Sequence, residues 1–268
     1  MIGVEFYKQV LRLRTYLLLG IIVAFPALLT LIFRIANPAD HAGVDQSFVV
    51  LAPNSGLNMA IATLGHAGDV VLPLIGVILA GSAVAEEASW GTLGYLLVRP
   101  VTRRRLLASK LLVVAVLILA ATALVTLLAV VAGLIAFGWQ PVVTPSGTML
   151  STSTALARVA IATPYMAWIM AGVMSVGFFI SSLSNSPLNG AAAAFGLAVI
   201  SRILDTLPFT LGGLQSFLPT HYWRAWEGLF ANSASWDDML VGSIIQLPYV
   251  IVFLALAFWS FRRKDILT

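Results

Sequence analysis

The densest group of charged side chains in this sequence lies at residues 86–110, between two long apolar stretches. It begins with the adjacent acids Glu86 and Glu87, and it ends with the basic run 103–105 and Lys110. Carboxylate and guanidinium groups can pair with one another or with the surface of a second protein. Both groups oppose the dipoles of the flanking helices, and pairing would offset that small penalty. The chemistry that this segment indicates is therefore recognition.

An apolar face lies inside the same segment. Leu93, Leu96 and Leu97 recur at helical spacing in a short helix that Pro100 ends, and Thr102 is the expected N-cap of the next helix. Exposed leucines at this spacing need a cover, so we expect a docking element; an ordinary charged loop with arginine anchors is the alternative. The expected docking residues are Glu86, Glu87, Trp90, Gly91, Thr92, Leu93, Tyr95, Leu96, Leu97, Arg99 and Pro100.

A second apolar pattern lies at the N-terminus. Phe6, Val10 and Leu13 recur at helical spacing and predict an amphipathic helix on the membrane surface. This helix would anchor the first span, or it would also contact a cytoplasmic partner. Its polar residues are expected to face away from the membrane: Glu5, Lys8, Gln9 and Arg12.

A third charged group consists of Arg202 and Asp205, at the end of an apolar stretch. The two residues are three apart and can share one helix face. We expect them to pair as an outer cap where the span leaves the membrane. The alternative is that both simply reach the lipid headgroups.

Motifs for catalysis and cofactor binding are absent from the sequence. There is no cysteine, which excludes disulfides, thiolate metal sites and cysteine nucleophiles. There is also no P-loop, no H-E-x-x-H and no G-x-S-x-G. His41, His66 and His221 are expected outside the membrane or near its outer edge, so none forms a haem or protease pair at membrane depth. We expect no enzyme and no cofactor in this chain; ATP and Mg²⁺ in a partner subunit are an expectation only through the family resemblance given at the end of this section.

The composition predicts an all-α polytopic membrane protein with a single transmembrane domain, 1–268. Hydrophobic residues make up 60% of the chain and charged residues 10%, whereas soluble domains carry about 25% charged residues. The mean hydropathy is +0.97. A span needs about 20 apolar residues. The six predicted spans cover about 16–35, 70–85, 111–137, 157–183, 187–204 and 240–261, and the second begins earlier if 57–68 continues it.

The segment that follows the fifth predicted span, 205–230, is apolar but interrupted. Prolines and glycines divide it too often for a span, and Trp223 and Trp226 follow the breaks. On these residues alone it is an outer loop with an interfacial aromatic belt.

The basic residues predict the orientation. With both termini in the cytoplasm, 11 of the 15 Lys and Arg residues fall inside and 4 outside, in line with the positive-inside rule. Membrane topology therefore explains these charges without nucleic acid. Asp69 and six other acids are expected outside, which leaves the spans nearly free of charge. Proton- or ion-coupled carriers usually keep charges at that depth, so secondary transport is not expected.

Several features at residues 86–110 resemble the type-2 ABC-exporter permeases, the group of bacterial multidrug, bacitracin and sodium export permeases. They are an acidic residue, the run 91–93, the leucine pairs 96–97 and 106–107, Pro100, the arginines 103–104 and Lys110. The resemblance implies that the segment is a coupling helix docked on a separate ATP-binding subunit. It also implies that two permeases face each other and that short re-entrant helices between spans five and six cap the path.

We therefore expect the permease subunit of an ABC exporter in the cytoplasmic membrane. It would act in multidrug efflux or a similar process and would move an apolar or amphipathic substrate. Its partners would be an ATP-binding cassette subunit, a second permease copy or homologue, and the lipid membrane. A non-transporting anchoring or assembly subunit is the main alternative, and a membrane enzyme is the next.

Overall fold

The computed structural model describes residues 2–36, 47–91, 102–207 and 213–263. The α-helices in these ranges are α1 (Ile2–Val10), α2 (Leu13–Ala36), α3 (Gly56–His66), α4 (Leu72–Ser82), α5 (Ala85–Ser89), α7 (Arg103–Phe137), α8 (Thr152–Ile169), α9 (Ala171–Leu183), α10 (Pro187–Thr206) and α11 (Asp237–Arg263). The shorter elements are the 3₁₀ helices η2 (Ala52–Asn54), η4 (Leu214–Phe217) and η5 (His221–Phe230), the π-helical turn η3 (Ala67–Val71), and an antiparallel hairpin of β1 (Val142–Val143) and β2 (Met149–Leu150).

Six helical stretches among the described residues are long and apolar enough to cross a membrane, which confirms the prediction of an all-α polytopic membrane protein. Four of them are α2, α7, α10 and α11. The other two are composite, because α3, η3 and α4 join into Gly56–Ser82 and α8 joins α9 in Thr152–Leu183. The second span therefore begins at Gly56, which confirms the earlier start that the sequence left open.

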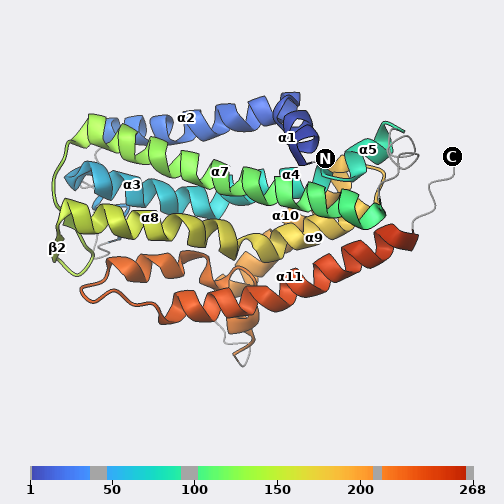
Figure 1. Cartoon of the computed structure of the whole chain (residues 1–268). Helices are drawn as coiled ribbons and strands as arrows, with labels where there is room; N and C mark the ends of the chain where they lie inside the picture. Colours follow the sequence, from blue (N-terminus) through green and yellow to red (C-terminus); the bar gives the residue numbers. More distant parts are fainter. Residues whose placement is uncertain (1, 37–46, 92–101, 208–212, 264–268) are drawn as a thin grey trace.

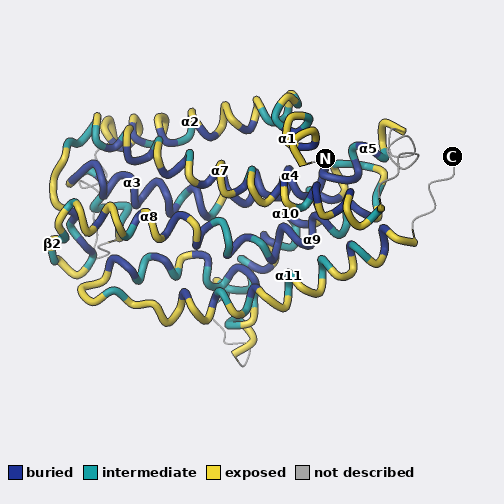
Figure 2. Tube along the Cα trace, in the orientation of Figure 1, coloured by how far each residue is buried: buried dark blue, intermediate teal, exposed yellow. Residues whose placement is uncertain are grey.

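The long helices lie side by side between two ends of a bundle (Figure 1). One end, which we call the basic end, carries α1, α5, the start of α7 and the last turn of α11. The opposite end carries β1 and β2, and we call it the hairpin end. The helices α3 and α4 run through the middle and are mostly buried, whereas α2 and α11 at the periphery are mostly exposed (Figure 2). An apolar exposed surface of this kind suits contact with lipid.

Polar residues in the second span explain why its first half was hard to recognise. Asn58 is fully buried, and its side chain exchanges two hydrogen bonds with the backbone of Val143, at 2.7 and 3.0 Å. Thr63 is also buried and donates to the carbonyl of Met59 at 2.8 Å. Each polar group thus has an internal partner, as a bilayer requires.

Glycine contacts fix the second span at both ends. At the hairpin end, the Gly56 N–H donates to the Gly138 carbonyl at 3.0 Å, and a Cβ at Gly133 would overlap the Gly56 carbonyl oxygen. At the basic end, a Cβ at Gly81 would overlap the backbone around Gly190 on α10. Small residues allow helix backbones to approach this closely in membranes.

The interrupted segment between spans five and six is not a span, as predicted, and its described part forms η4 and η5. The longer of the two, η5, lies between α8 and α11 in the hairpin half of the bundle (orange in Figure 1). Irregular backbone at membrane depth has to be satisfied by neighbouring protein groups. Three side chains on the spans donate to its carbonyls: Tyr165 to Tyr222 at 2.8 Å, Gln246 to Pro219 at 2.7 Å, and Tyr249 to Phe217 at 2.7 Å.

The glycine contact at the basic end generates a stability prediction. Gly81→Val should lower the melting temperature of the purified protein in detergent, because the added side chain meets the backbone of α10 rather than a movable side chain. Overpacking of this kind destabilises by about 1–3 kcal/mol. Gly20→Val is the matched control, because a Cβ there meets nothing within 4 Å. Equal melting temperatures for the two variants would contradict the close contact.

Candidate functional site

Seven charged side chains meet at the basic end and form what we call the N-terminal cluster. They come from the segment around α1, from the acidic pair of α5 and from the first turns of α7 (Glu5, Lys8, Arg12, Arg14, Glu86, Glu87 and Lys110). The cluster thus connects the N-terminal helix to the start of the predicted docking segment.

Lys110 is the centre of this cluster. Its side chain is 0% exposed, and its Nζ lies 2.8 Å from Glu5 Oε1 and 2.8 Å from Glu87 Oε2. The second oxygen of Glu87 lies 2.9 Å from Lys8 Nζ. A buried charge is tolerated when partners of opposite sign surround it. Lys110 therefore holds α1, α5 and α7 together.

The neighbouring Glu86 is held by the chain between α1 and α2. Its carboxylate pairs with Arg12 and lies 2.9 Å from Arg14 Nη1. The Arg12 guanidinium also lies over the Trp90 ring, 5.1 Å from its centroid, at a distance that suits a cation–π contact. Both glutamates at the start of the predicted docking segment are thus bound to the N-terminal part of the chain.

The electrostatics of Glu5 show how the cluster keeps its charges. Burial raises the pKa of the Glu5 carboxyl, but the charge and hydrogen bond of Lys110, with smaller contributions from Gln9 and Lys8, outweigh burial. The net pKa lies below the ordinary value, so the native state favours the carboxylate. The resulting stabilisation is present above the unfolded-state pKa and is lost as pH falls through the lowered folded-state pKa.

The polar face of α1 is turned toward the protein interior. Glu5 and Gln9, which were expected to face away from the membrane, are 6% and 1% exposed. The reason is Lys110, whose buried charge needs acceptors from α1. The apolar residues point outward instead: Phe6 is 40% and Leu13 76% exposed. Leu13 also belongs to α2, because α1 ends at Val10.

The predicted docking segment is described only at its edges. Trp90 is exposed, and Gly91 has a positive φ of 67° at the end of α5. Thr102 caps α7, its hydroxyl accepting from the Arg105 N–H, which confirms the predicted N-cap. Arg103 donates to the carbonyls of Phe261 and Arg262 on α11. The remaining docking residues lie outside the described residues: Thr92, Leu93, Tyr95, Leu96, Leu97, Arg99 and Pro100.

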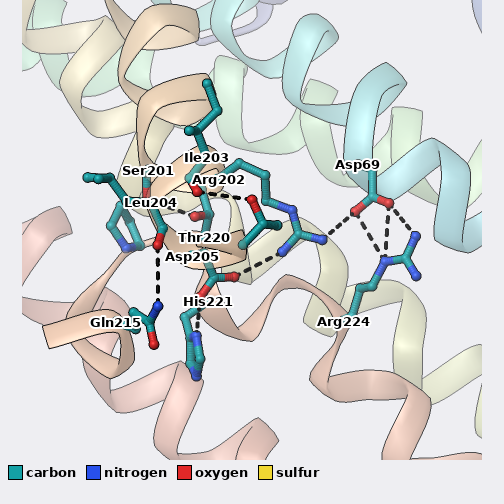
Figure 3. A network of polar contacts seen from close by, with 12 residues as sticks. Asp69, Ser201, Arg202, Ile203, Leu204, Asp205, Gln215, Thr220, His221 and Arg224 are labelled. Carbon is teal, nitrogen blue, oxygen red and sulfur yellow. Dashed lines mark hydrogen bonds and ion pairs between the residues drawn. The ribbon is translucent and has the colours of Figure 1, made fainter. Parts of the chain in front are cut away.

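A second charged site lies in the hairpin half of the bundle, where the sequence predicted none inside the membrane. Asp69 was expected outside, but it is the central residue of the span Gly56–Ser82 and belongs to the π-helical turn η3. Figure 3 shows its carboxylate between two arginines. Arg224 of η5 binds it through Nη2 and through Nε, the latter 3.1 Å from Oδ2, and Arg202 Nη2 lies 3.3 Å from Oδ1.

These residues continue into an alternating series that we call the mid-span charge chain. Arg202 Nη1 lies 3.2 Å from Asp205 Oδ2, which confirms the predicted pair, and Asp205 also bonds His221. At the other end, Arg224 Nη1 lies 3.6 Å from Glu227 Oε1. The chain runs Glu227, Arg224, Asp69, Arg202, Asp205, His221, and it connects η3, α10 and η5.

The depth of the chain constrains what can lie next to it. The side chains of Asp69, Arg202 and Arg224 are 24%, 31% and 44% exposed, and charged groups at mid-span do not face lipid. They therefore face water or another protein. Ionisable residues at this depth and π-helical turns both recur at functional sites. Sequence reasoning placed Asp69, His221, Arg224 and Glu227 in outer loops because their partners are far away in the chain.

A third feature is an apolar cavity. It has a volume of about 470 Å³ and lies between α7, α8, α9 and α11, with Trp168, Met174 and Phe178 in its walls. Such a cavity suits an apolar group rather than an ion. Among the described residues, no three His, Asp or Glu side chains are arranged to hold a metal ion.

Comparisons with known proteins give a family but no chemistry. The family model described as "Protein of unknown function (DUF2705)" matches residues 48–267. A curated protein of Bacillus subtilis (strain 168), named "Uncharacterized membrane protein YdbK", is 24% identical over 230 residues, which cover 84% of this chain and 86% of that protein. The family model's match, residues 48–267, includes all of the mid-span charge chain. Of the N-terminal cluster it includes Glu86, Glu87 and Lys110 but not the residues before 48.

The buried ammonium generates the second prediction. Lys110→Met should destabilise the purified protein by about 3–5 kcal/mol, because it leaves Glu5 and Glu87 buried without their shared cation. The loss should shrink at acidic pH, where protonated carboxyl groups no longer repel. Lys8→Met is the control, since that side chain is 39% exposed. Melting temperatures of both variants, measured over a range of pH, would show this difference. Equal effects of the two changes at neutral pH would contradict the central role of Lys110.

The mid-span charge chain generates the third prediction. Arg224→Gln should lower the melting temperature by about 2–4 °C, equivalent to about 1 kcal/mol for a pair this exposed. Adding Asp69→Asn should recover part of the loss. The reason is that Arg224→Gln leaves the Asp69 carboxylate with too few partners, and the second change removes that carboxylate. Arg34→Gln, at the exposed end of α2, serves as control. A purely additive double variant would show that Asp69 and Arg224 do not interact.

Proposed function

This chain belongs to the family described as "Protein of unknown function (DUF2705)", and we propose that it is the permease subunit of an ATP-driven exporter. In this proposal the spans cross the cytoplasmic membrane and both termini are cytoplasmic. The basic end therefore faces the cytoplasm. The observation that carries the proposal is the N-terminal cluster, which ties the acidic pair before the segment 92–101 to three helices.

The cluster supports a coupling role for that segment. A permease without a P-loop has to receive motion from an ATP-binding subunit and pass it to its spans. Glu86 and Glu87 begin the predicted docking segment, 86–100, and their bonds reach α1, α2 and α7. A displacement of the segment would therefore move these helices as a unit. ATP and Mg²⁺ belong to the partner subunit in this scheme.

The mid-span charge chain favours a transporter over the alternative of an anchoring or assembly subunit. An anchor needs only apolar helices, and charged groups at mid-span are costly to keep. Their presence also removes the reason for which secondary transport was not expected. Here three carboxylates and two arginines lie in one chain, with part of their surface exposed. A second permease copy, facing the first across a hydrated path, would give these charged side chains polar surroundings, which lipid does not provide.

The apolar cavity supports the proposed substrate class. Its walls between α7, α8, α9 and α11 offer no charged group, and Ser175 is the polar side chain among them. A site of this composition suits an apolar or amphipathic molecule. The proposed direction is outward, as in the exporters that the sequence resembles at residues 86–110.

The experiment that tests the proposal changes the coupling segment. Leu96→Asp would place a charge in an interface with an ATP-binding subunit and should weaken association by several kcal/mol, about 2–4 for an interface centre. We expect normal membrane levels, reduced copurification of the ATP-binding subunit and loss of transport-coupled ATPase activity. Met149→Asp, which puts the same charge on the exposed hairpin, should change none of these.

Two outcomes would count against the proposal. An intact complex with undiminished coupled ATPase activity in Leu96→Asp would show that residues 86–100 are not the coupling element. Purification of the unaltered protein without any subunit that carries a P-loop would favour the anchoring alternative.

A further inference from the structure

The mid-span charge chain is not balanced among its described members. It contains three carboxylates, on Asp69, Asp205 and Glu227, but only two guanidinium groups, on Arg202 and Arg224. With a neutral His221 the chain carries one excess negative charge. An uncompensated charge is unfavourable at membrane depth, so one bound proton would bring the chain to neutrality.

Glu227 is the carboxylate of the chain that is held most weakly. Arg224 uses Nε and Nη2 for Asp69, and its remaining Nη1 lies 3.6 Å from Glu227 Oε1. That separation is too long for a hydrogen bond. Asp69 and Asp205, by contrast, each have two partners in the chain.

Glu227 also has access to water from the hairpin end. It lines a hollow of about 400 Å³ together with Ser146, Asn232 and Ser233, which are exposed. It lines a second, deeper hollow of about 130 Å³ whose walls include His66 and Arg224. The carboxylate therefore lies where solvent at the hairpin end meets the charge chain.

We propose that Glu227 is a proton-binding site, which takes a proton from water at the hairpin end and thereby neutralises the mid-span charge chain. In this step an O–H bond forms at a Glu227 carboxylate oxygen and the donor is hydronium, so no other reactant is needed. The inference goes beyond the proposed function, because it concerns the charge balance of this chain whatever the protein transports.

The environment of Glu227 acts in the required direction. Burial raises the pKa of its carboxyl, the charge of Arg224 lowers it, Asp69 raises it, and Arg202 lowers it. The net pKa lies above the ordinary value, so the native state favours the neutral acid. The stability associated with this proton is present at acidic pH and is lost as pH rises through the raised folded-state pKa.

Protonation has a structural consequence through Arg224. When Glu227 is charged, Arg224 is shared between that carboxylate and Asp69. When Glu227 is neutral, the attraction of Arg224 is directed to Asp69, which strengthens the connection between η5 and the central span. The proton would therefore determine how firmly the segment 213–230 is held against η3.

Other titratable groups surround η5 on every side. His66 of α3 shares the deeper hollow, and its Nδ1 lies 2.8 Å from the Ala62 carbonyl. His221 bonds Asp205 at the far end of the chain. The remaining groups on elements packed against η5 are Asp69 of η3, Arg202 of α10, Arg158 and Tyr165 of α8, and Asp237, Asp238 and Tyr249 of α11.

Infrared difference spectra of the purified full chain at a series of pH values test the proposal, because they show the C=O stretch of a protonated carboxylic acid. The unaltered protein should show this band at acidic pH and lose it as pH rises. Glu227→Gln should abolish the band. Its melting temperature should also stay near the acid-side value of the unaltered protein as pH rises.

Three variants keep the test decisive. Asp69→Asn retains Glu227 but removes a carboxylate that raises its pKa, so the band should persist and shift to lower pH; this holds even if Glu227→Gln does not fold. His221→Gln and His66→Gln should leave the band and its pH dependence unchanged. A band that survives in Glu227→Gln, or a pH dependence of the melting temperature that disappears in His221→Gln instead, would overturn the proposal.

Discussion

A bilayer supplies neither hydrogen-bond partners nor screening, so charges and irregular backbone that are buried in this protein need partners within the chain. The N-terminal cluster meets that requirement with Lys110 between Glu5 and Glu87. The segment 213–230 meets it with Tyr165, Gln246 and Tyr249, which donate to its carbonyls. The arrangement of the helices follows from these contacts as much as from apolar packing.

The two charged sites differ in how tightly they are enclosed, and this separates what they can do. In the N-terminal cluster, Lys110 and Glu87 are 0% and 1% exposed, so their ion pairs are shielded from salt and water. In the mid-span charge chain, Arg224 is 44% exposed and its second carboxylate is loosely held. The first site suits a rigid joint between helices. The second suits a contact that changes strength with its surroundings.

Local patterns in the sequence predicted the features that depend on near neighbours. The six spans follow from apolar runs, the cap at Thr102 from its position before a helix, and the pair of Arg202 and Asp205 from their three-residue spacing. The depth of Asp69 could not be predicted in this way, because its arginines lie 133 and 155 residues further along the chain. The buried polar face of α1 was missed for the same reason, since Lys110 lies 105 residues from Glu5.

The glycine contacts at the two ends of the second span bear on how this span can bend. Gly56 and Gly81 bring its ends against α7 and α10 so closely that a Cβ at either position would overlap the neighbouring backbone. Between them, η3 contains the wider π-helical turn. One residue more or less in a helical turn rotates all that follows by about 100°. We therefore expect any bending of this span at η3, and Asp69 is located on it.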